Sequence, residues 1–262
     1  MVIPKNIEDE NANAVYAERI GYVCGFLIYL ILLIYGSQVM MGVMEEKTNR
    51  IAEVIVSSVK PFQMMLGKIL GIGLVALTQF LLWIAFVLII YNVGKASGNT
   101  GLAGDMVGSM QNVFTSVNVP LILFCFGFYF LAGFFFYSSL YGAIGSAVNE
   151  DMREAQSLSF PVTMLVIISI AMMSTAIANP TGPVAVWGSI IPFSSPIVMM
   201  ARIPFGVPGT VPWWQLILSM SVLILSFMFT VWFAAKIYRT GILMYGKKPT
   251  WKEMIKWAFR KN

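Results

Sequence analysis

The residues best suited to ionic contacts are concentrated in one short segment, residues 45–68, which reads EEKTNRIAEVIVSSVKPFQMMLGK. Glu46 and Arg50 are four positions apart, so they can pair on one face of a helix. Apolar residues recur beside them at helical spacing: Ile51, Val54, Ile55 and Val59. Pro61 suits the first turn of a following helix. This pattern predicts an amphipathic helix at the membrane surface, joined by a tight turn to the next span. An interfacial helix without a partner would show the same pattern.

A second charged cluster interrupts the long apolar stretches further along the chain. It lies within the segment AVNEDMREAQSLSFPVTM, residues 147–164, and its charged residues are Glu150, Asp151, Arg153 and Glu154. Two interpretations stay open. The cluster is either a solvated loop or a second contact near the cytoplasmic entrance of a pathway.

The composition excludes several kinds of catalytic and metal site. The chain has no histidine, which rules out His-based triads, HExxH zinc sites and His-ligated haem. Cys24 and Cys125 lie in apolar runs without CxxC spacing. Gly67-Lys68 is followed by Ile69, where a phosphate-binding loop needs Ser or Thr. We therefore expect no catalytic residue, no metal ion, no bound cofactor and no nucleotide site in this chain.

The elements that position these clusters are membrane helices. The chain has 262 residues, of which 58% are hydrophobic and 11% charged, whereas soluble domains carry about 25% charged residues. Its uncharged runs are each long enough for a span of about 20 residues. The predicted fold is an all-α integral membrane protein with five transmembrane helices, near residues 20–43, 69–92, 119–144, 158–178 and 213–236.

Residues 184–207 are apolar but unsuited to a sixth straight span. Pro192 and Pro196 would interrupt such a helix. Short helices that enter the membrane and turn back fit better, with protein or water covering the irregular backbone. We expect an external re-entrant helical hairpin that meets near Phe193–Pro196. Arg202 is a lone charge there, which lies either at the external interface or facing the exit of a pathway.

The distribution of basic residues predicts the orientation. With five spans and a cytoplasmic C-terminus, 13 of the 17 Lys and Arg residues lie on the cytoplasmic side. The division is then an external N-terminal tail (1–19), a transmembrane domain (20–245) and a basic cytoplasmic tail (246–262). The expected location is the cell membrane, with multiple spans and the N-terminus outside. Orientation and lipid contact explain the basic charge, so no nucleic-acid partner is expected.

The string MEEKTNRIAEVIVSSVKPFQMMLGKILG resembles the characteristic segment of the ABC-2 type transporter permeases, including the sodium-extruding and drug-resistance branches. The matching positions are Glu45, Glu46, Lys47, Arg50, Glu53, Ser57, Ser58, Pro61, Phe62, Gly67 and Lys68. Residues 147–164 and 191–206 match the family in style. The resemblance covers most of residues 20–245.

This resemblance implies a permease subunit of an ABC exporter, an efflux component that forms the pathway while a separate ATPase subunit uses ATP. It also implies a second permease chain, in a homo- or heterodimer, within the lipid bilayer. Residues 45–60 would be the coupling helix that rests on the ATPase. The implied coupling residues are Glu45, Glu46, Arg50, Ile51, Glu53, Val54, Ile55 and Pro61.

Such permeases usually have six spans, with an external domain between the first two, so the resemblance implies that this chain lacks the first span and that domain. The alternative function is a non-transporting membrane scaffold or assembly factor, or an inactive permease remnant. A channel or secondary carrier is a third possibility. The uncharged runs contain no carboxylate of the kind that proton-driven carriers need.

Overall fold

The computed structural model describes residues 5–49, 59–96, 117–148, 151–244 and 250–259, which form helices and connecting turns without a strand. The long helices are α1 (Lys5–Thr48), α3 (Pro61–Ala96), α5 (Val119–Ala147), α6 (Met152–Ala178) and α9 (Trp213–Gly241). The short ones are α7 (Pro183–Ile190), α8 (Ser195–Arg202), the 3-10 turn η1 (Ile203–Phe205) and α10 (Trp251–Ala258).

Five helices are long and apolar enough to cross a membrane: Ala14–Thr48, Phe62–Gly94, Val119–Ala147, Met152–Ala178 and Trp213–Gly241. This confirms the predicted all-α integral membrane fold. Each predicted span lies inside one of these helices, but the helices run further at their charged ends. The reason is that Glu and Lys are good helix formers, so α1 continues through Glu45, Glu46 and Lys47 beyond its uncharged run.

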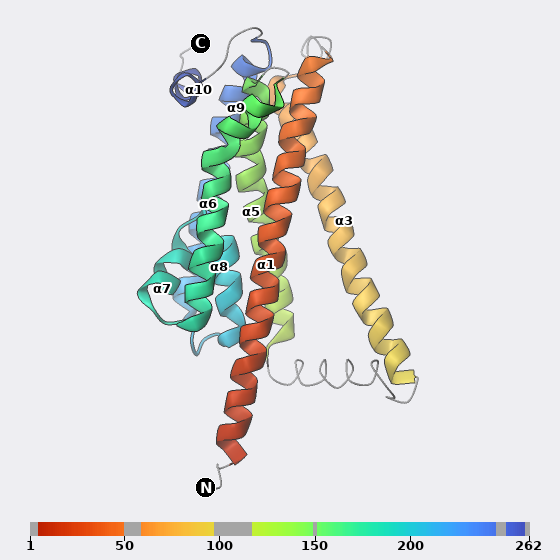
Figure 1. Cartoon of the computed structure of the whole chain (residues 1–262), viewed down its shortest axis with the longest axis vertical. Coiled ribbons are helices and arrows are strands. Elements are labelled where there is room, and N and C mark those ends of the chain that lie inside the picture. Colours follow the sequence, from red (N-terminus) through yellow and green to blue (C-terminus); the bar gives the residue numbers. More distant parts are fainter. Residues whose placement is uncertain (1–4, 50–58, 97–116, 149–150, 245–249, 260–262) are drawn as a thin grey trace.

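The bundle is built around α5, which packs along α1 on one side and α9 on the other. Half of the apolar part of α5 is buried, against 11% of that of α3. Figure 1 shows why: α3 meets the bundle at the end near the C-terminus and diverges from it toward the other end. Most of the surface of α3 is therefore left to lipid or to another chain.

Glycines allow the helices to touch closely at the end where α3 joins. A Cβ on Gly145 of α5 would lie 2.5 Å from the carbonyl oxygen of Met40 on α1. A Cβ on Gly241, at the end of α9, would lie 2.9 Å from the carbonyl oxygen of Ser146. Small residues at such crossings bring backbones together in membrane bundles. The ends of α1, α5 and α9 thus meet closely.

Residues 183–202 form a helical hairpin that leaves and returns to the same end of the bundle, as Figure 1 shows for α7 and α8. Its tip is held at mid-bundle, because Tyr137 donates a hydrogen bond to the carbonyl of Phe193 over 2.7 Å and Ser169 donates to the same oxygen over 3.3 Å. Pro196 lies in the first turn of α8, where a proline costs no helical hydrogen bond. Every residue of α8 is buried.

Candidate functional site

The charged residues gather where α1, α5 and α9 end and where α3 and α6 begin. We call this the basic end of the bundle; its described basic residues are Lys47, Lys60, Lys68, Arg153, Lys236, Arg239, Lys252 and Lys256. In Figure 1 it lies at the top, on the side of the C-terminus. Of the two segments singled out in the sequence, the described residues 45–49 and 59–60 of the first and 147–148 and 151–154 of the second belong to this end.

Lys47 is buried at the centre of the basic end, with 1% of its surface exposed. Its ammonium donates to the carbonyl oxygens of Ser146 at 2.9 Å, Ala147 at 3.3 Å and Gly241 at 2.9 Å. These carbonyls end α5 and α9, where helices lack backbone donors and carry partial negative charge. An ammonium has three donors, so one side chain of α1 ties the ends of two other helices.

Glu46, the preceding residue, ties α1 to α3. Its Oε1 lies 2.6 Å from the ammonium of Lys68, which also donates to the carbonyl of Gly42. The Glu46 and Lys68 side chains are 24% and 19% exposed, so water screens this ion pair only in part. The other carboxylate oxygen of Glu46 is buried and has no hydrogen-bond partner among the described residues. The ends of four helices are therefore joined through residues 46 and 47.

The predicted coupling segment starts and finishes in this joined region. Glu45 and Glu46 belong to the last turn of α1. The side chains of Glu45 and Thr48 are both exposed there. Pro61 begins α3, as expected. The remaining predicted coupling residues, Arg50, Ile51, Glu53, Val54 and Ile55, lie outside the described residues. The segment is thus entered from α1 and left through α3.

In the second charged cluster, Asp151 caps the start of α6 by accepting a hydrogen bond from the backbone N–H of Arg153 over 2.9 Å. Glu154 follows in the first turn, close enough to Lys47 for electrostatic interaction. The cluster lines a hollow of about 480 Å³ shared with Thr250 and Trp251 at the start of α10. Glu150 lies outside the described residues. Asp151 and Arg153 are exposed and Glu154 is half-buried, so the described part of the cluster borders an open hollow at the basic end.

Arg202 is buried inside the hairpin, with no exposed surface. It donates to the carbonyl of Pro180 at 2.8 Å, the hydroxyl of Ser189 at 2.5 Å and the amide oxygen of Gln215 at 3.1 Å. A guanidinium stays charged in proteins, and these neutral oxygens satisfy it. Arg202 therefore fastens the hairpin to the end of α6 and the start of α9. The sequence marked this residue as unusual but did not indicate its partners.

The family model of the ABC-2 family transporter proteins matches residues 3–236. The chain belongs to the ABC-2 transporter family. The resemblance drawn from residues 45–68 is confirmed. Membership and the long apolar helices make the chain a multi-pass membrane protein of this transporter family.

Two curated relatives are themselves uncharacterized. YhaP of Bacillus subtilis (strain 168) is 31% identical over 242 residues, which cover 91% of this chain and 54% of YhaP. MJ1024 of Methanocaldococcus jannaschii is 30% identical over 243 residues, which cover 92% of this chain and 54% of MJ1024. The chain therefore spans about half the length of the curated relatives it matches. No solved structure matches the chain.

Proposed function

We propose that the chain is the permease subunit of an ABC exporter. A separate ATPase subunit uses ATP and acts on the segment between α1 and α3, and a second permease chain completes the translocation pathway. Family membership supports the transport role. The contacts of Glu46 and Lys47, which join the ends of four helices, support the proposed coupling to the ATPase.

Coupling requires that a push on residues 49–60 reach the membrane helices without being absorbed locally. The covalent chain carries it into α1 and α3. The buried Lys47 carries it into α5 and α9, because its three hydrogen bonds end on their last turns. The pair of Glu46 and Lys68 keeps α1 and α3 from separating at this level. A push from the ATPase would therefore move four helix ends together.

The proposed orientation puts the basic end in the cytoplasm and the N-terminus outside, in agreement with the excess of basic residues there. Exposed tryptophans on α9 indicate where this span meets the two membrane interfaces, whichever side is cytoplasmic. Trp213 and Trp214 stand at one end and Trp232 near the other. Trp213 and Trp232 are 19 positions apart, about 28 Å along a helix. Tryptophans favour the two interfaces of a hydrocarbon core that is about 30 Å thick.

In this orientation the hairpin of α7 and α8 opens to the outer side. Phe193 and Pro196 then lie at its tip, halfway across the bundle, where an exit from the pathway would begin. Arg202 holds the hairpin in place rather than contacting the transported molecule, since all three of its hydrogen bonds are internal.

A charge-swap experiment tests the coupling. Glu46→Lys and Lys68→Glu each place like charges together, and each should lower permease-stimulated ATP hydrolysis by about tenfold, with less effect on ATPase binding. The double swap Glu46→Lys/Lys68→Glu should restore much of the stimulation. Lys252→Glu, an exposed charge reversal on α10, is the matched control and should have no effect. Unchanged hydrolysis in both single variants would refute transmission through this pair.

A further inference from the structure

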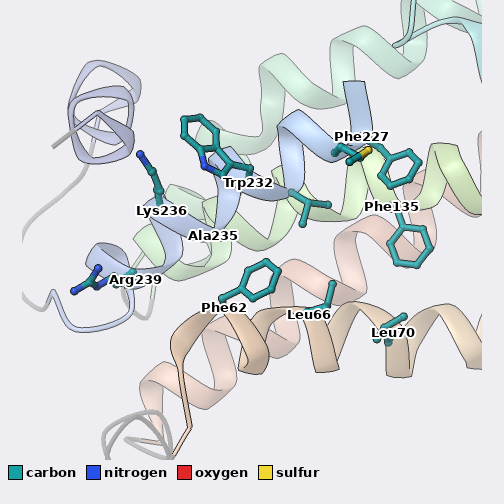
Figure 2. Close-up of a pocket in the computed structure, with 11 residues that line it drawn as sticks. Phe62, Leu66, Leu70, Phe135, Phe227, Trp232, Ala235, Lys236 and Arg239 are labelled. Atoms are coloured by element: carbon teal, nitrogen blue, oxygen red, sulfur yellow. The ribbon is translucent and has the colours of Figure 1, made fainter. Parts of the chain in front are cut away.

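An apolar groove runs between α3 and α9, with α5 behind it, and its volume is about 550 Å³. Leu66 and Leu70 line it from α3, and Phe227 and Val231 from α9. Figure 2 shows these helices facing each other across the groove, with Lys236 and Arg239 together at one end. The groove therefore has apolar walls and two cationic side chains at its basic end.

The groove runs from the headgroup level into the hydrocarbon of one leaflet. From Arg239 to Phe227 it follows 12 residues of α9, about 18 Å. Half of a hydrocarbon core is about 15 Å. Trp232 lies near the interface at the basic end, and the ammonium of Lys236 lies 4.3 Å from the centre of its ring. Lys236 and Arg239 are exposed and stand at the level of lipid headgroups.

The volume of the groove and the two cationic side chains at its end together indicate which kind of molecule binds there. A volume of 550 Å³ is typical of sites for small apolar ligands. The two cations at the headgroup level attract the phosphate of an anionic lipid. The occupant that fits both features is a lipid with an acyl chain and a negatively charged head.

We propose that this groove is a binding site for an anionic phospholipid of the leaflet at the basic end. The acyl chain lies between α3 and α9, and the phosphate contacts Lys236 and Arg239. The site would brace α3, which the rest of the chain leaves largely uncovered. This inference goes beyond the proposed function, because it involves neither the ATPase nor a second permease chain.

Native mass spectrometry of the detergent-purified chain tests the site, with dioleoyl phosphatidylglycerol and dioleoyl phosphatidylcholine as probes. The anionic lipid should bind once per chain and more tightly than the zwitterionic one. The double variant Lys236→Gln/Arg239→Gln should weaken phosphatidylglycerol binding by about 30-fold, the effect of two surface cations. Lys252→Gln/Lys256→Gln removes equal charge from α10 and should leave binding unchanged.

The walls are tested separately. Val231→Trp fills the groove and should abolish phosphatidylglycerol binding, whereas Leu225→Trp, on an exposed part of α9 that does not line the groove, should preserve it. Three results would overturn the proposal: equal binding of the two lipids, equal losses in the control variants, or disulfide cross-linking of two chains through Leu70→Cys in nanodiscs. The last result would place a second copy in the groove. None of them bears on ATPase stimulation, so this proposal and the coupling proposal can fail independently.

Discussion

Replacing Lys47 by methionine should loosen the basic end of the bundle. Methionine occupies a similar volume, so the change removes the charge and the donors without opening a large cavity. The carbonyls of Ser146, Ala147 and Gly241 would each lose the ammonium donor, although that of Gly241 keeps the backbone N–H of Met244. Because these oxygens end two different helices, the loss would affect the packing of α1, α5 and α9 together.

The expected size of the effect follows from these contacts. A hydrogen bond to a charged group contributes about 1.5–3 kcal/mol, and three of them end on Lys47. The desolvation of a buried ammonium opposes this gain, and water can satisfy part of the freed carbonyls at the end of the bundle. We expect a net loss of about 3 kcal/mol in the free energy of unfolding. For a chain of this size that lowers the unfolding midpoint by about 6–12 °C.

The assay is thermal unfolding in detergent at a fixed heating rate, followed by a thiol-reactive fluorophore. Cys125 is buried in the folded chain and becomes reactive on unfolding. Lys252→Met removes the same charge from an exposed position on α10 and is the control, with an expected midpoint within about 1 °C of wild type. A Lys47→Met midpoint equal to or above that of wild type would refute the role assigned to this side chain.

Three further predictions concern packing, the hairpin and topology. Gly145→Ala should cost about 1–3 kcal/mol in unfolding free energy, because the added Cβ meets the backbone of α1. Gly127→Ala, on the same helix, is the control: its Cβ meets nothing within 4 Å, so the change should cost far less. Equal unfolding midpoints of the two variants would contradict the close crossing of α1 and α5. Arg202→Met leaves buried oxygens without donors and should make the hairpin more sensitive to added protease; unchanged digestion would contradict its fastening role. In a background without native cysteines, Ser97→Cys should react with an impermeant thiol reagent from outside and Thr250→Cys should not; labelling at 250 would reject the orientation.

The long helices could be predicted because a membrane imposes a minimum apolar length, and the uncharged runs meet it. Helix ends were harder to predict. α6 starts at Met152, six residues before the predicted span, because a helix can leave the hydrocarbon without ending. The hairpin followed from Pro192 and Pro196, whose effect on a helix is local. In these cases the determining physics acts within a short stretch of sequence.

The contacts at the site could not be predicted, because they join distant parts of the chain. Lys47 binds carbonyls 99 to 194 positions away, and the sequence suggested only that it belongs to a charged helical segment. Phe130 and Phe134 are buried in the core, although an aromatic helix facing lipid would have the same composition. The groove likewise depends on how far α3 leans from α9. Packing between helices decides each of these features, and hydropathy does not record it.

The most direct test of ATPase coupling is the composition of the complex that the chain forms in its own membranes. The tagged chain should be purified in mild detergent, with bound proteins identified by mass spectrometry and their ATP hydrolysis measured. We predict that an ABC ATPase subunit co-purifies at about one per permease chain, and that Arg50→Glu reduces its recovery by at least about tenfold while Lys256→Glu does not. Recovery of the chain without any ABC ATPase, or equal recovery with wild type and Arg50→Glu, would contradict the proposed coupling.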